Sequence, residues 1–239
     1  MGNDFIRTAV KLQPGPKNPQ GLKMEGGPPR VTLHRTVGQG FEGNASFLAS
    51  EGYEVQVLWD PFTGQIGQFY PLSQGGYGLQ HKGVATNAHG LVNIQIEMCD
   101  YGKSFNLTDS PMKGWNYILE AVRSWGIPDH WPLGLPSTLS GPRAGGDATT
   151  WLNDAGWYGH CHVPGNEHYD PGTIDAVKLF GIDTSGVDNM DEATFKKWVA
   201  DVVDSRVALL LHGIKGDPTH QFGLLQIKQA VDKLNSPNP

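Results

Sequence analysis

The chain has 239 residues and a formal net charge of −6 at pH 7, which excludes a nucleic-acid binder that relies on phosphate contacts. Hydrophobic residues make up 38% of the chain, enough for a substantial core, and the 32 Gly and 17 Pro residues favour long, shaped loops over a helical bundle. No run of 18 apolar residues is present, so we expect no membrane insertion.

The N-terminal residues lack a charged region followed by an apolar core, so we expect no secretory signal. Two cysteines, Cys99 and Cys161, do not make a disulfide framework in a chain of this length. These features predict a protein made in a cytoplasm, and an action outside the cell would need a separate release step.

The first half of the chain alternates predicted strands with shaped loops. Residues 1–29 are rich in Pro and Gly and predict an extended arm laid over the domain. A β-rich run over 30–36 predicts a buried strand that delivers His34 at its C-terminal end. Residues 44–50 predict a short helix, and 53–59 with 65–72 predict a hairpin. After a Gly-rich loop, residues 91–98 alternate cleanly and place Glu97 on the polar face of a strand.

The second half is predicted to be mostly helical. Ser110-Pro111 predicts the start of a helix with an apolar stripe that ends at Trp125. Shorter helices are predicted over 148–154 and 173–180. Beyond a soft boundary near residue 184, two amphipathic helices are predicted, over 191–211 and 221–234.

The most unusual stretch runs from Gly159 to Gly172 and holds three His residues, two carboxylates and a Cys among Gly and Pro residues. Such a run fits neither a core strand nor a helix interior. A rigid turn that presents imidazoles and carboxylates is what a metal site or an acid–base site requires. We therefore expect the rest of the chain to supply partners for this turn.

Two His residues and one carboxylate, with a fourth position left open, form a recurrent catalytic zinc set. The candidates are His34, His160 and Asp170, and the ten-residue spacing of the last two suits the ends of a tight loop. Glu97 is then the candidate general base toward zinc-activated water. His168 is the alternative third ligand if the loop folds differently.

These residues resemble the zinc-dependent N-acetylmuramoyl-L-alanine amidases of the type-2 class, which share their fold with peptidoglycan recognition proteins and phage amidase lysozymes. The strand-end His, the Gly-His and the later Asp of that family match His34, Gly159-His160 and Asp170-Pro171-Gly172. Its strand that ends in a general-base Glu matches 93–97. The run 159–172 is most similar to endolysins of phages that infect actinobacteria. The resemblance covers roughly residues 28–182.

The resemblance implies an α/β fold with a central mixed β-sheet flanked by helices, and a catalytic domain in residues 1–183. It also implies a zinc cofactor and hydrolysis of the amide bond between N-acetylmuramic acid and L-alanine in bacterial peptidoglycan. Glu97 would be the general base, and His168 would stabilise the oxyanion. Asn166, like His162, is also a candidate for orienting the loop. The predicted substrate contacts are His81, Asn166 and, as a stacking platform in a Pro-rich loop, Trp131.

Three functions remain open. The first is a phage endolysin, stored in the host cytoplasm and brought to the wall by holin-type release. The second is a recognition protein that binds peptidoglycan without cutting it, and the third is a cytosolic amidase that recycles muropeptides. Recognition proteins of this family lose a zinc ligand, whereas this chain retains all three matches and the Glu, which favours catalysis. The helical segment 184–239 would bind the wall or pack on the domain, and the sequence does not indicate an oligomeric state.

Overall fold

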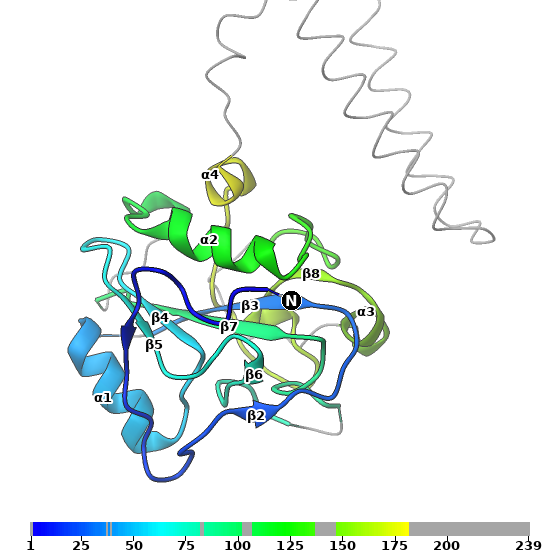
Figure 1. Cartoon of the computed structure of the whole chain (residues 1–239). Helices are drawn as coiled ribbons and strands as arrows, with labels where there is room; N and C mark the ends of the chain where they lie inside the picture. The colour runs from blue at the N-terminus through cyan, green and yellow to red at the C-terminus, as the bar shows by residue number, and fades with distance from the viewer. Residues whose placement is uncertain are drawn as a thin grey trace, which may run out of the picture. The chain divides into compact units, whose positions relative to one another are not determined.

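The computed structural model describes residues 2–36, 38, 40–81, 84–101, 107–136 and 147–181. These residues form a mixed α/β fold around a central six-stranded sheet, which confirms the expected fold class (Figure 1). The two helices predicted over 191–211 and 221–234 lie outside the described residues. The division into a catalytic domain and a helical segment therefore stays a prediction.

The six strands of the sheet lie in the order β1-β5-β4-β7-β3-β8, and β2 and β6 form a separate pair. Only β4 and β5 pair antiparallel within the six-stranded sheet, as the two strands of the predicted hairpin. The strands are β1 Val10–Lys11, β2 Leu22–Lys23, β3 Arg30–Arg35, β4 Val57–Trp59, β5 Ile66–Gln68, β6 Gln74–Gly75, β7 Asn93–Met98 and β8 Gly156–Gly159. The helices are α1 Phe41–Glu51, α2 Trp115–Ser124, α3 Ala148–Asn153 and α4 Ala176–Phe180.

The two faces of the sheet differ in chemistry. Helix α2 covers one face and α1 the other (Figure 1). On the α2 side, the apolar residues of β7 join the main core together with Trp115 and Ile118 of the helix. The opposite face of β7 carries Asn93, Gln95 and Glu97, as the alternation predicts, and these polar residues are also buried. A buried polar row must find partners, so this face is where a site can form.

The structure differs from the local predictions in several places. Helix α2 begins at Trp115, because Ser110 instead closes the 3-10 turn Leu107–Asp109 by bonding back to Leu107. Helix α4 begins at Ala176, where the Asp175 side chain accepts the N–H groups of the first turn. Strand β8 was not predicted, since four residues with a Gly at each end show little alternation. The N-terminal arm is not merely laid over the domain, because it contributes β1 and β2.

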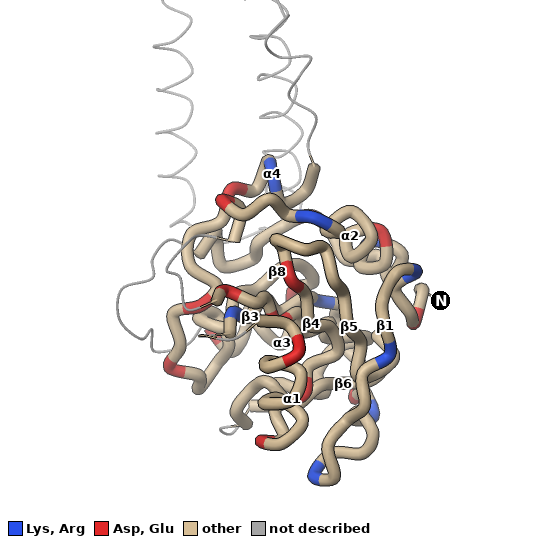
Figure 2. Tube along the Cα trace, turned by 90° about the vertical axis from the view of Figure 1, so that its left-hand side faces the viewer, with Lys and Arg blue, Asp and Glu red and all other residues tan. Residues whose placement is uncertain are grey.

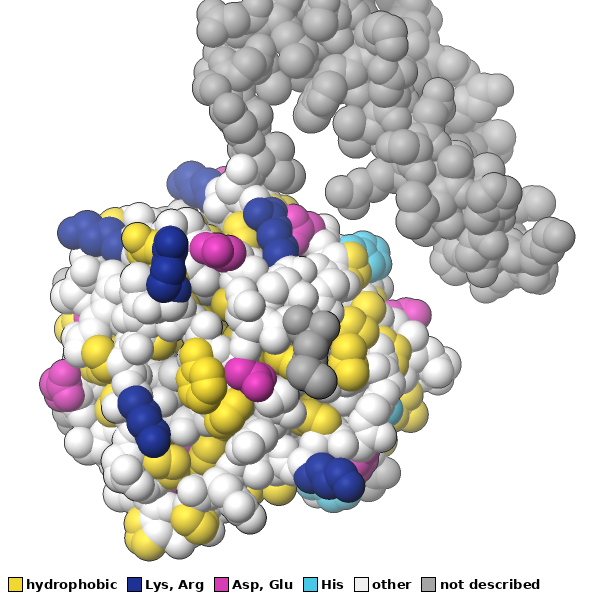
Figure 3. All heavy atoms as spheres, viewed as in Figure 1, with side chains coloured by type: hydrophobic (Ala, Val, Ile, Leu, Met, Phe, Trp, Pro, Cys, Tyr) yellow, Lys and Arg dark blue, Asp and Glu magenta, His cyan; other side chains and the backbone are white. Residues whose placement is uncertain are grey.

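Charged and apolar side chains are mixed on the face of the molecule that Figure 3 shows. Lys and Arg positions are scattered along the chain rather than gathered on one face (Figure 2). Among the described helices, none has the length and apolar character needed to cross a membrane.

Candidate metal centre

The sheet topology brings two histidines to the same edge. Strand β3 pairs in parallel with β7 on one side and β8 on the other, with His34 opposite Glu97 and Leu33 opposite Gly159. His160 follows β8 directly, so it lies next to His34. The carboxyl ends of parallel strands are where α/β proteins commonly bind ligands.

The loop after β8 returns Asp170 to this edge. The N–H of Cys161 donates to the backbone oxygen of Asp170 at 3.0 Å, and the N–H of Arg35 donates to Asp170 Oδ2 at 3.2 Å. Gly159 is required for this closure, because a Cβ there would lie 2.6 Å from Cδ of Pro171. The carboxylate is thus fixed both to the loop and to the end of β3.

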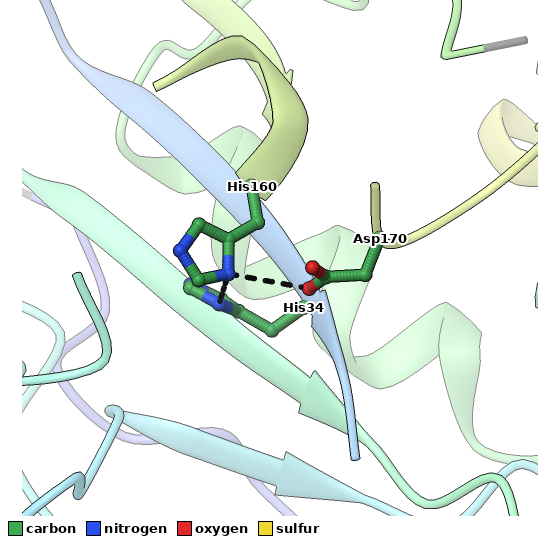
Figure 4. Close-up of side chains that lie close together, drawn as sticks. All are labelled: His34, His160 and Asp170. Atoms are coloured by element: carbon green, nitrogen blue, oxygen red, sulfur yellow. Dashed lines mark hydrogen bonds and ion pairs between the residues drawn. The ribbon is translucent and has the colours of Figure 1, made fainter. Parts of the chain in front are cut away.

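The three predicted ligands converge in the structure (Figure 4). The Nδ1 atoms of His34 and His160 are 3.1 Å apart, and His160 Nδ1 is 3.3 Å from Asp170 Oδ2. One donor atom from each residue lies within 4.8 Å of the others, and all three residues are buried. Tetrahedral zinc with bonds of about 2.0–2.1 Å places its ligand atoms about 3.3–3.4 Å apart. The donor set and its spacing therefore fit a zinc ion.

The electrostatics of the cluster also suit a cation. Burial, followed by the neighbouring His160, holds the pKa of His34 well below its usual value, so its imidazole is neutral, as a ligand must be. Burial raises the pKa of Asp170, but its close contacts with His160 and His168 outweigh that effect and hold the pKa well below its usual range. The centre thus presents the neutral imidazole of His34 close to the ionised carboxylate of Asp170.

Glu97 is the penultimate residue of β7, lies beside His34 and is only 8% exposed. Burial raises its pKa well above the usual value, and the nearby carboxylates of Asp170 and Asp100 raise it further. A divalent cation held by the three ligands would oppose the effect of Asp170 and lower this pKa. A proton acceptor at this position would therefore depend on the metal.

His168 lies beside the cluster without joining it. Its Nδ1 is 3.2 Å from Oδ1 of Asp170, the carboxylate oxygen that does not face His160. Its ring stacks on that of His160, with centroids 3.7 Å apart and 12° between the planes. The side chain is about 42% exposed. The structure thus groups Asp170, and not the alternative His168, with the two buried histidines.

A cavity of about 740 Å³ opens over this centre. His34, Glu97, His160, His168 and Asp170 all line it. Its walls also carry Arg35 and four aromatic residues that sequence reasoning missed, namely Phe47, Tyr53, Tyr77 and Tyr169. Phe47 could have been noticed as a large apolar residue on the exposed face of α1, outside the buried side of that helix.

The three predicted substrate contacts fare differently. The predicted stacking role of Trp131 is corrected, because this side chain is only 7% exposed and packs in the core against Trp157 and His162. The predicted substrate contact of Asn166 is also corrected, because this residue is fully buried and bonds to His160 and to the backbone of Gln80. His81 is exposed beside Gln80 and does not line the cavity, so its contact with substrate stays a prediction.

No protein-family model matches the chain, and no curated protein matches it. Among solved structures, the hydrolase AmiA of Staphylococcus aureus, determined in complex with its ligand, aligns with a TM-score of 0.43 and 15% sequence identity. The alignment covers 72% of this chain and 82% of that chain. A likeness at this level does not assign the chain to a family.

Proposed function

We propose that the protein is a zinc-dependent amidase that cleaves the amide bond between N-acetylmuramic acid and L-alanine in peptidoglycan. The observation that carries this proposal is the convergence of two imidazoles and one carboxylate beside a buried Glu in one cavity. That set is typical of zinc hydrolases. The resemblance of 159–172 and of the His34 strand to type-2 amidases supplies the bond and the substrate.

His34, His160 and Asp170 would hold the metal. Zinc bound there would act as a Lewis acid toward the amide carbonyl and toward water. The end of β3 fixes this arrangement, since it carries His34 and donates the Arg35 N–H to Asp170 Oδ2. A ligand set fixed by backbone elements needs little rearrangement on metal binding.

Glu97 is the proposed general base. It accepts a proton from the water that attacks the carbonyl carbon, and then delivers that proton to the amide nitrogen as the C–N bond breaks. Burial and the neighbouring carboxylates raise its pKa in the metal-free site, and cation binding would lower it. Proton acceptance is thereby coupled to an occupied centre.

His168 is the proposed donor to the developing oxyanion. Asp170 Oδ1 accepts from its Nδ1, and stacking on His160 fixes the plane of the ring. A proton on the other ring nitrogen would let it donate to the carbonyl oxygen as negative charge develops there. Phe47 and Tyr53, exposed on the cavity wall, offer apolar faces on which a sugar ring can stack.

The test is digestion of purified cell wall by the zinc-loaded protein. The proposal predicts new N-terminal alanine without new reducing sugar, and loss of this product in Glu97→Gln, which keeps all three ligands. New reducing ends would instead identify a glycosidase. Tight muropeptide binding with neither product would identify a recognition protein.

We propose further that the amidase serves as a phage endolysin that reaches the wall of its host from the cytoplasm by holin-type release. The support for this role is the similarity of 159–172 to endolysins of actinobacterial phages. Expression in an actinobacterial host should cause lysis only when a membrane-permeabilising partner is present. Activity on soluble muropeptides with none on intact wall would favour the recycling role instead.

A further inference from the structure

Asn166 connects a proposed metal ligand to the cavity wall. It is fully buried, and its Oδ1 lies 3.1 Å from Nε2 of His160 and accepts the N–H of Gln80 at 2.9 Å. Its Nδ2 donates to the backbone oxygens of Gln80 and Pro164, at 3.0 and 3.1 Å. Because both partners of Nδ2 are carbonyls, the amide can adopt only one orientation, with the oxygen toward His160.

This orientation decides which nitrogen of His160 carries the proton. The amide oxygen can only accept, so Nε2 of His160 must be the N–H donor. In a neutral imidazole the lone pair then lies on Nδ1, the atom that faces His34 Nδ1 at 3.1 Å and Asp170 Oδ2 at 3.3 Å. We propose that Asn166 is a positioning residue that holds His160 in its Nε2–H tautomer and so presents Nδ1 to the metal.

This inference rests on the metal site of the proposed function but not on its substrate. Hydrogen bonds to the second nitrogen of a ligating His orient the ring, and their loss typically weakens metal binding about 10–100-fold. The simpler explanation is that Asn166 only ties the loop at Gln80 to the loop at Pro164. That role would contribute stability without selecting a tautomer.

The chain contains a matched control for the simpler explanation. Gln68, in β5, makes the same kind of paired contact, since its Oε1 accepts the Ile6 N–H at 3.1 Å and its Nε2 donates to the backbone oxygens of Asp4 and Tyr70 at 2.6 and 2.8 Å. Gln68 is buried like Asn166, and among the described residues its side chain bonds to the N-terminal arm and to Tyr70 rather than to a proposed ligand. Gln68→Ala therefore removes equivalent loop contacts and leaves the ligands in place.

The experiment compares zinc affinity in Asn166→Ala, Gln68→Ala and the wild type, by competition with a chromophoric chelator and without substrate. We expect the Kd for zinc to rise about 10–100-fold in Asn166→Ala and to stay within about twofold of the wild type in Gln68→Ala. Thermal unfolding of the metal-free variants should show losses of similar size. Equal zinc affinities in the two variants would overturn the inference.

A second measurement needs no variant. Long-range ¹H–¹⁵N correlation spectra of the metal-free wild type at mildly alkaline pH report which His160 nitrogen is protonated. We expect a proton on Nε2, and a ring protonated on Nδ1 but not on Nε2 would overturn the inference even if Asn166→Ala does not fold. If the wild-type protein binds zinc but does not cleave the cell wall, the proposed amidase activity is rejected, whereas the proposed role of Asn166 in zinc binding still stands.

Discussion

Replacing Glu97 with Gln should stabilise the metal-free protein, and increasingly so as the pH rises. The Glu97 carboxyl is 8% exposed and lies near the carboxylates of Asp170 and Asp100, so its folded pKa lies well above the ordinary value of about 4.3. A group whose folded pKa is raised contributes stability below its unfolded pKa and loses it as the pH rises toward the folded one. The Gln variant has no such loss.

The magnitude follows from the number of protons involved. One proton retained by the folded state and released by the unfolded state changes stability by about 1.4 kcal/mol per pH unit. The difference in unfolding free energy between Glu97→Gln and the wild type should therefore grow by about 1 kcal/mol per pH unit above about pH 5. The contributions of His34 and Asp170 are common to both proteins and largely cancel in this difference.

The assay is urea unfolding in EDTA at several values between about pH 5 and pH 6.5, a range that begins above the unfolded pKa of Glu. Glu120→Gln, at an exposed position of α2, is the control and should track the wild type. Adding zinc should shrink the Glu97 difference, because the cation lowers the folded pKa of that carboxyl. Parallel pH profiles for Glu97→Gln and the wild type in EDTA would refute the account of a buried, proton-retaining Glu97.

Three further substitutions separate the core, the cavity wall and the oxyanion position. Trp131→Ala should cost about 3–5 kcal/mol of stability and leave KM for peptidoglycan unchanged in the folded fraction, and a raised KM with intact stability would restore its glycan-stacking role. Phe47→Ala, at an exposed position on the cavity wall, should change stability by less than about 0.5 kcal/mol and raise KM, whereas unchanged kinetics would remove it from the substrate path. His168→Gln should lower kcat about 10²-fold while zinc affinity holds, and a matching loss of zinc affinity would instead make it a ligand.

The parts of the fold that follow from local periodicity could be predicted from the sequence. The alternation around Glu97 and the β-rich run ending at His34 specify two strands, and their parallel pairing places both residues at one sheet edge. The residue types and the ten-residue spacing within 159–172 predicted His160 and Asp170 as ligands, and the resemblance to a known motif supported them. The structure adds the contacts that join them, which pass through the Arg35 N–H and the Cys161 N–H.

The parts that depend on tertiary packing could not be predicted. Trp131 lies in a Pro-rich loop that indicates exposure, yet packing against Trp157 buries it. Asn166 looks like a polar loop residue, and only the approach of Gln80, 86 positions away in sequence, gives its amide a fixed orientation. The sequence around a residue does not indicate which distant segment will pack over its side chain.

The central claim is that a metal held by His34, His160 and Asp170 is needed for amide hydrolysis, and zinc titration of the metal-free protein tests it most directly. The measured quantity is the release of new amino groups from purified peptidoglycan. Release by the wild type should rise to a plateau at one zinc ion per chain, and Asp170→Asn should release none at that concentration. Full release without zinc, or the same plateau in Asp170→Asn, would contradict the account.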